Sequence, residues 1–435
     1  MKPVLLKLLT TSALLLGAAS LHAEDLLATY RLAQQSDPTL RAAEAGNQAA
    51  QQGRAQSRAA LLPQVNASAN VTQNSHDITG VGTTDYESTG YSVSLVQSLY
   101  HHDYYKQLQV ADAGIAKANA QYEAARQGLI LRVAEAYFNL LAAQDNLASA
   151  EASKRAIDQQ LRQTQQRFEV GLTAITDVHE AQAGYDATVA AEIAARNGLD
   201  IAREALREIT GQEPLALSTL QEEMPLLTPE PADIGQWVER AREQNLSLVA
   251  AEAAARAAVE ELRRREAGHY PTLDLVANHS YSDTTDLPVT GNESTNTSIG
   301  VQLSVPIYSG GLTTAQSREA RALLSQAQEA LEAQRRATER EVRSAYLGIT
   351  AGIGQVNARK QALSSAQTAL EATQTGFEVG TRTAVDVLNA QQVRYSAQSN
   401  YARARYDYLL ATLKLKQAAG SLSEEDLTLV NGWLK

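Results

Sequence analysis

Four short segments of the chain alternate between apolar and polar side chains, which is the pattern of β-strands with one apolar face. The alternation is clearest in residues 65–72 and 299–307, and it recurs around residues 91–95 and 273–275. Polar loops at 75–90 and 282–297 are expected to separate the two strands of each pair. We expect strands of about 9–11 residues, the length of a tilted strand in an outer membrane.

Helical patterns fill most of the remaining chain. The predicted helical stretches are 25–60, 104–168, 174–209, 233–268, 312–376 and 383–418. At 1.5 Å a residue, a helix of about 65 residues spans about 100 Å, which no globular core requires. Such lengths are typical of coiled coils and helical barrels. Gly171 and Gly380 are expected to end the two longest helices, because glycine adopts the left-handed conformation that follows a helix end.

The chain repeats itself. Residues 25–45 resemble 233–253, and the sequence Phe-Glu-Val-Gly at 168–171 recurs letter for letter at 377–380. We therefore predict two copies of one module of helix, strand pair and long helix pair, which is too long for a solenoid unit. The predicted divisions are a first repeat at 24–211, an irregular proline-rich connector at 212–232, a second repeat at 233–420 and a C-terminal segment at 421–435.

The first 23 residues have the pattern of a signal peptide. Lys2 and Lys7 form a charged start, an apolar stretch follows, and Ala23 is a small residue at the expected cut. A single membrane-spanning helix is the alternative, but the apolar stretch is short for one. The pattern predicts export across the inner membrane, and no later run of apolar residues is long enough to span a bilayer as a helix.

Four strands cannot close a barrel by themselves. An open sheet edge in lipid would leave backbone N–H and C=O groups without partners, so the chain must complete its sheet by oligomerising. A small soluble sheet is the alternative interpretation of the same alternation. The export signal and the very long helices favour the membrane interpretation.

Composition narrows the function further. The chain has 38 Lys and Arg against 49 Asp and Glu, so it lacks the basic surface that nucleic-acid binding requires. It has no cysteine, which excludes disulfides, thiolate metal sites and a cysteine nucleophile. It also lacks a phosphate-binding Gly-Lys-Ser/Thr loop, a His-Glu-x-x-His motif and a Gly-x-Ser-x-Gly motif. The sequence therefore predicts neither an enzyme nor a cofactor-binding protein.

The segments after the two Phe-Glu-Val-Gly turns carry a family resemblance. Residues 170–178 read VGLTAITDV and residues 379–388 read VGTRTAVDVL. Together with the order of elements, they resemble the TolC family, the outer-membrane channel-tunnels of bacterial efflux and type I secretion. The resemblance implies an α+β homotrimer whose 12-stranded outer-membrane β-barrel, with four strands from each chain, continues into a periplasmic α-helical barrel. It also implies a periplasmic adaptor protein and an inner-membrane ABC or proton-driven pump as partners.

The resemblance also places a periplasmic aperture. Asp386 matches the acidic residue that constricts the entrance on the trimer axis, and Asn389 stands one turn later, where a second Asp is often found. The alternative interpretation, which does not use the resemblance, is that Asp386 and its counterpart Asp177 each stabilise the positive end of a helix.

A gating latch is implied beside the aperture. Arg382, which Thr173 replaces in the first repeat, is expected to pair with Asp177 and so to join the two helix pairs. Phe377 stands where family members often have a tyrosine, and without a hydroxyl it would hold the latch less firmly. Arg405 matches a position that ties neighbouring helices. An exposed charge is the alternative for Arg382.

The glycine turns match the tips on which an adaptor hairpin docks in the family. The expected docking residues are Val170, Gly171, Leu172, Val379, Gly380 and Thr381. Two other functions remain open at this point. A structural periplasmic coiled-coil protein would share the long helices, and an ungated general porin would share the strands.

Overall fold

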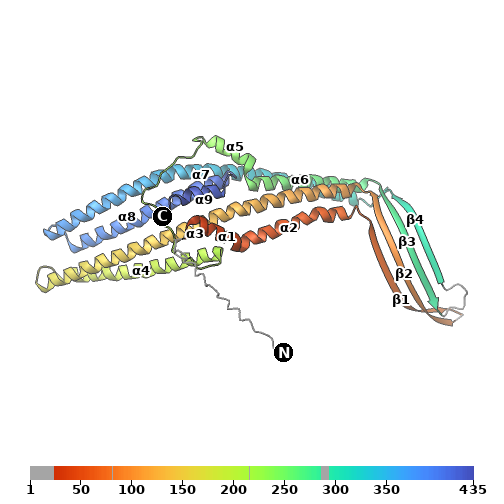
Figure 1. Ribbon diagram of the computed structural model, residues 1–435, viewed down its shortest axis with the longest axis horizontal. Coiled ribbons are helices and arrows are strands. Elements are labelled where there is room, and N and C mark those ends of the chain that lie inside the picture. Colours follow the sequence, from red (N-terminus) through yellow and green to blue (C-terminus); the bar gives the residue numbers. More distant parts are fainter. Residues whose placement is uncertain (1–23, 81, 215, 286–292) are drawn as a thin grey trace, which may run out of the picture.

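The computed structural model describes residues 24–80, 82–214, 216–285 and 293–435. The predicted signal peptide, residues 1–23, lies outside the described residues. The molecule is elongated: a sheet forms one end, two long helical hairpins form the other, and shorter helices pack around the middle (Figure 1). We call this middle region the waist.

The sheet has four antiparallel strands in the order β1-β2-β3-β4. The strands are β1 (Gln64–Ile78), β2 (Gly82–Tyr100), β3 (Thr272–Thr285) and β4 (Glu293–Ser304). β1 and β2 pair along their whole length, from Gln64 opposite Val96 to Ile78 opposite Gly82. β2 also pairs with β3, so the two predicted repeats meet in the middle of the sheet.

The strands have 12 to 19 residues and are longer than predicted. The prediction of a polar loop at 75–90 is wrong. Most of that segment is paired strand, and the loop expected at 282–297 is likewise strand at both ends. Threonine and tyrosine supply part of this polar extension, and both residue types form strands readily when neighbouring strands complete their hydrogen bonds. The strand predicted to reach residue 307 instead ends at Ser304, because Pro306 has no N–H for the ladder.

The first helical stretch that the sequence predicts in each repeat consists of two helices in the structure. The four helices are α1 (Leu26–Ser36), α2 (Pro38–Ala59), α5 (Ile234–Gln244) and α6 (Leu246–Glu266), and a short 3-10 turn, η1 (Ala267–His269), follows α6. The first break follows from Pro38, since a residue before proline avoids the helical conformation. Asp37 there is extended, and its carboxylate accepts a hydrogen bond from the N–H of Leu40 at 2.7 Å. Asn245 makes the equivalent break and caps α6 through the N–H of Leu248.

The four long helices lie where the sequence predicts them. They are α3 (His102–Glu169), α4 (Ile175–Thr210), α7 (Leu312–Glu378) and α8 (Ala384–Ala418). We call α3–α4 the first hairpin and α7–α8 the second hairpin. Their tips lie at the end of the molecule opposite the sheet (Figure 1). Among the described residues, no helix is both long and apolar enough to cross a membrane.

The main hydrophobic core lies at the waist, where Tyr137 and Phe138 of α3 pack with Leu409 and Leu413 of α8. The connector and both ends of the described chain meet here. The N–H of Glu24 donates to the carbonyl of Ala216 at 2.7 Å, and Leu220 pairs with Leu434. The last helix, α9 (Glu424–Asn431), packs beside this junction.

Candidate functional site at the helix tips

Each hairpin tip is a glycine turn of the same design. Gly171 and Gly380 have φ of +75° and +82°, the left-handed region that glycine enters without strain. In the first tip the N–H of Leu172 donates to the carbonyl of Arg167 at 2.8 Å. In the second, the N–H of Thr381 donates to the carbonyl of Gly376, also at 2.8 Å. These bonds satisfy carbonyls at the helix ends, so both turns can be sharp.

The predicted docking residues are exposed in the single chain. Val170, Leu172 and Val379 are 69%, 72% and 70% accessible, and Gly171, Gly380 and Thr381 beside them are exposed too. Three large apolar side chains therefore face solvent at the ends of the hairpins. Apolar side chains gathered in this way mark a surface that a partner can cover.

Asp386 belongs to a complete capping box at the start of α8. Its carboxylate accepts hydrogen bonds from the N–H and the hydroxyl of Thr383, at 2.9 and 3.0 Å, and its own N–H donates to the Thr383 hydroxyl at 3.2 Å. The Thr383 N–H and hydroxyl, together with the charge of Arg382, hold the pKa of Asp386 below its usual range. The spacing Thr-x-x-Asp is a local sequence signal for a capping box. It indicates this role of Asp386 independently of the family resemblance.

The predicted latch partners do not form an ion pair in the single chain. The Thr173 hydroxyl donates to Asp177, and the charge of Arg382 acts on Asp386. Arg382 instead lies so close to Gly376 that a Cβ atom there would come within 2.7 Å of its side chain. The pairing of Arg382 with Asp177 stays a prediction.

A different contact joins the hairpins at Phe377. The guanidinium carbon of Arg167, on the last turn of α3, lies 4.5 Å from the centroid of the Phe377 ring, on the last turn of α7. The sequence marks Arg167 only as a basic residue near a helix end, a place where it favours the helix dipole. Nothing in that pattern indicates which helix its side chain reaches.

Arg405 lies at the waist and not at the tips. One of its terminal nitrogens donates to the carbonyl of Gln221 in the connector, and its guanidinium lies 5.5 Å from the ring of Tyr401. Its charge also acts on Asp145 of α3. Arg405 therefore ties α8 to the connector, and its predicted role in the latch stays a prediction.

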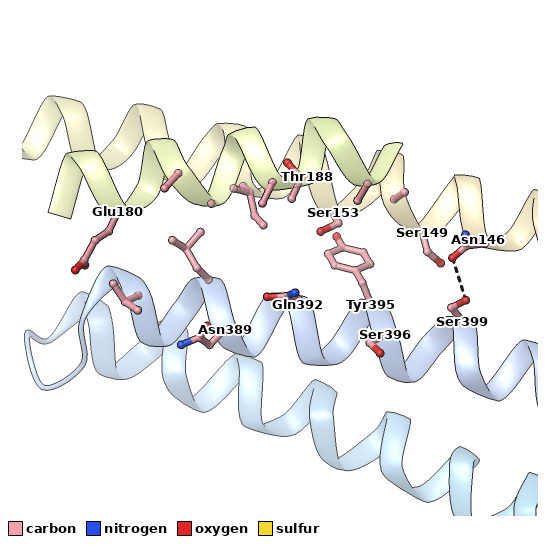
Figure 2. Close-up of a pocket in the computed structure, with 18 of the residues that line it drawn as sticks. Asn146, Ser149, Ser153, Glu180, Thr188, Asn389, Gln392, Tyr395, Ser396 and Ser399 are labelled. Carbon is pink, nitrogen blue, oxygen red and sulfur yellow. Dashed lines mark hydrogen bonds between the residues drawn. The ribbon is translucent and has the colours of Figure 1, made fainter. Parts of the chain in front are cut away.

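Asn389 lines a cavity of about 680 Å³ between the two hairpins. Its walls come from α3, α4 and α8, with Glu180 and Thr188 on α4 facing Gln392 and Tyr395 on α8 (Figure 2). Asn146 and Ser399 close one end through a hydrogen bond of 3.3 Å (Figure 2).

An apolar cluster lies near this cavity. Ile157, Leu161, Ala181 and Leu388 are each at most 8% accessible, and together they pack α8 against α3 and α4. The hairpins are thus joined by an apolar contact that lies beside this cavity. Among the described residues there is no group of three or more metal-ligating side chains.

Comparisons with known proteins match almost the whole chain. The family model described as "Outer membrane efflux protein" matches residues 29–212 and 237–421. Outer membrane protein TolC of Vibrio cholerae serotype O1 is 42% identical over 434 residues, which cover 99% of this chain and 98% of that protein. The alkaline protease secretion protein AprF of Pseudomonas aeruginosa is 33% identical, over 96% of this chain and 89% of the relative.

A solved structure shares the fold at low sequence identity. The crystal structure of the Campylobacter jejuni CmeC outer membrane channel superposes with a TM-score of 0.77 at 16% identity. The match covers 95% of this chain and 90% of that one. The arrangement of a four-stranded sheet and two long helical hairpins is therefore one that a solved channel also adopts.

Proposed function

The chain belongs to the outer membrane efflux protein family, and we propose from this premise how it works. It lies in the bacterial outer membrane, where it is an exit channel for efflux and type I secretion. The observation that carries this conclusion is identity of 42% to a TolC protein along 99% of the chain. The family is one of channels and is not a known class of enzymes.

We propose that three copies complete the barrel, with 12 strands in all. The four-stranded sheet of one chain leaves β1 and β4 as its edges, and unpaired edges are not stable in lipid. Large apolar side chains on both edge strands support a location in lipid, because they stand on a face of the sheet and are exposed in the single chain. Val71 on β1 is 72% accessible and Ile299 on β4 is 77% accessible in the single chain.

The partners we propose are a periplasmic adaptor and an inner-membrane pump of the ABC or proton-driven type. The adaptor would cover the exposed residues of the two glycine turns, from Val170 to Leu172 and from Val379 to Thr381. Burial of apolar surface gives such a contact its affinity, at about 25 cal/mol for each Å² of apolar area. The pump supplies the energy, and this chain serves as a passive duct.

Purified full-length protein in lipid bilayers tests this function. We expect trimers in the outer-membrane fraction, and we expect purified trimers to give long-lived, low-conductance channels. Monomers in detergent, or recovery in the soluble periplasmic fraction, would favour a structural coiled-coil protein. A large conductance that never closes would favour an ungated porin.

We propose that Asp386 forms the aperture and predict that it controls cation block. Three carboxylates around a narrow axis attract multivalent cations, so Asp386→Asn should weaken block by such ions in single-channel recordings. Mutual repulsion between the three carboxylates should raise the pKa of at least one, against the lowering by Thr383 and Arg382. Asp386→Asn should therefore also remove the pH dependence of the block.

Asn389→Asp is the matched variant for the aperture. It adds a carboxylate one turn beyond Asp386, and we expect stronger block if a second ring stands there. Block that Asp386→Asn leaves unchanged would remove this residue from the entrance.

We propose that Arg382 and Asp177 pair in the closed trimer, and we predict that either change opens the channel. Arg382→Ser and Asp177→Ala should each raise the resting conductance severalfold and admit large antibiotics to the cell, since about 1.4 kcal/mol changes an equilibrium tenfold. The double variant should leak little more than either single variant, because both remove one interaction. Additive leakage would show that the two residues act separately.

A further inference from the structure

A polar cavity lies between the hairpins near their tips. It has a volume of about 790 Å³ and lies between α3 on one side and α7 and α8 on the other. We call this cavity, together with the contact across it, the seam. Six glutamines line the seam, together with Arg167, Phe377 and a few other residues: Gln159, Gln160, Gln163, Gln166, Gln374 and Gln391.

The buried amides of the seam are not paired with each other. Gln160 on α3 and Gln391 on α8 are only 6% and 5% accessible. The side-chain nitrogen of Gln160 and the side-chain oxygen of Gln391 have no hydrogen-bond partner among the described residues. A hydrogen bond between these two buried amides therefore does not hold the hairpins together.

Arg167 and Phe377 form the direct contact across the seam. The guanidinium carbon stands 4.5 Å from the ring centroid, well inside the range of about 6 Å within which a cation is attracted to an aromatic face. Both side chains are half-buried, so water screens the attraction less than at an open surface. No ion pair or side-chain hydrogen bond of the described residues involves the guanidinium of Arg167.

We propose that Arg167 is a positioning residue of the gate, which holds the second hairpin against the first through the Phe377 ring. The proposal rests on the proposed function, because it assigns the contact that keeps the tips of this channel together. The proposal gives Phe377 a role that requires its aromatic ring and no hydroxyl. The ring face, not a hydrogen bond, is what the cation recognises.

The test compares Arg167→Met, Phe377→Leu and the double variant in the full-length protein in bilayers. Each single change should raise the resting open fraction about 2- to 30-fold, the range that a cation–π contact supplies. The double variant should match the larger single effect, because both changes remove one contact. Arg167→Lys should restore part of the closure, and Phe377→Tyr should keep all of it.

Arg162→Met is the matched control. Arg162 lies on the same helix, its side chain is 72% accessible, and it pairs with Asp158 one turn away. The change removes the same charge without touching the seam, so the open fraction should stay at its original value. If Arg167→Met behaves like Arg162→Met, or if the effects of Arg167→Met and Phe377→Leu add, the proposal is overturned.

A distance measurement separates this proposal from the proposed function. The chain has no cysteine, so spin labels can be placed on cysteines introduced at the exposed positions Leu172 and Val379, which do not line the seam. With Arg167 present, we expect a narrow distance distribution between labels on the two tips, and in Arg167→Met a broader and longer one. A change in distance without any channel activity would uphold the contact and refute the function. Unchanged distances in an active channel would refute the contact alone.

Discussion

Gly420→Ala is expected to destabilise the protein by about 2–5 kcal/mol. Gly420 follows the end of α8 with φ of +76°, a conformation that costs an L residue about 1–2 kcal/mol. A Cβ atom there would also overlap the carbonyl oxygen of Gln244 and come within 2.8 Å of the nitrogen of Asn245. Backbone atoms cannot move aside as a flexible side chain can, so overpacking adds about 1–3 kcal/mol. Denaturant unfolding followed by helical circular dichroism measures the loss.

Gly211→Ala is the matched control for this prediction. Gly211 ends α4 with φ of +71°, so the conformational cost is the same. Its new Cβ atom would meet only the side chain of Ser36, whose Cβ lies at the ordinary distance of 3.5 Å. We expect a loss of about 1–2 kcal/mol. Equal losses in the two variants would show that the close approach at Gly420 does not matter.

Asp37→Ala is expected to cost about 3 kcal/mol. The Asp37 side chain is 2% accessible and performs two tasks at once. It caps α2 through the N–H of Leu40, and it accepts hydrogen bonds from both terminal nitrogens of Arg132, at 3.1 and 2.7 Å. Loss of a cap costs about 1 kcal/mol. The rest comes from leaving Arg132 without its partner, and it is below the roughly 3–5 kcal/mol of a fully buried pair because Arg132 is 37% accessible.

The Asp37 carboxylate should also make the free energy of unfolding depend on pH. Burial alone would raise the pKa of Asp37, but the bonds from Arg132 and from the N–H of Leu40 hold that pKa below its ordinary value. A lowered folded-state pKa adds stability above the unfolded-state pKa, and this stability is lost as the pH falls through the folded-state pKa. Asp37→Asn should keep the cap, as Asn245 does for α6, and lose this pH dependence. An unchanged acid-unfolding profile in Asp37→Asn would contradict the assignment.

The long helices were predictable because their signal is local. An uninterrupted helical pattern followed by glycine indicates both the helix and its end, and α3 and α7 begin and end within about two residues of the prediction. The strand lengths were not predictable in the same way. The polar half of each strand depends on hydrogen bonds from its neighbours, which no alternation of apolar residues records.

The turns at the hairpin tips were predictable, and the contacts between the hairpins were not. Gly171 and Gly380 follow their helices in the left-handed conformation, as the sequence predicts, because that signal lies in neighbouring residues. The approach of Arg167 to Phe377 joins residues of two different helices, and its geometry depends on how the hairpins pack. Arg405 shows the same limit, since its partner Gln221 lies in a connector whose path the sequence does not specify.

The near-equal lengths of the hairpins also constrain how such a chain can change size. α3 and α7 have 68 and 67 residues, and α4 and α8 have 36 and 35, so both tips reach the same level. Deleting one residue from a single helix would shorten it by about 1.5 Å and turn everything beyond the deletion by about 100° around the axis. Insertions and deletions are therefore tolerable only in matched sets, taken from all four helices in whole turns. A designer who wishes to fit this duct to a wider or narrower periplasm would have to edit the chain at four places together.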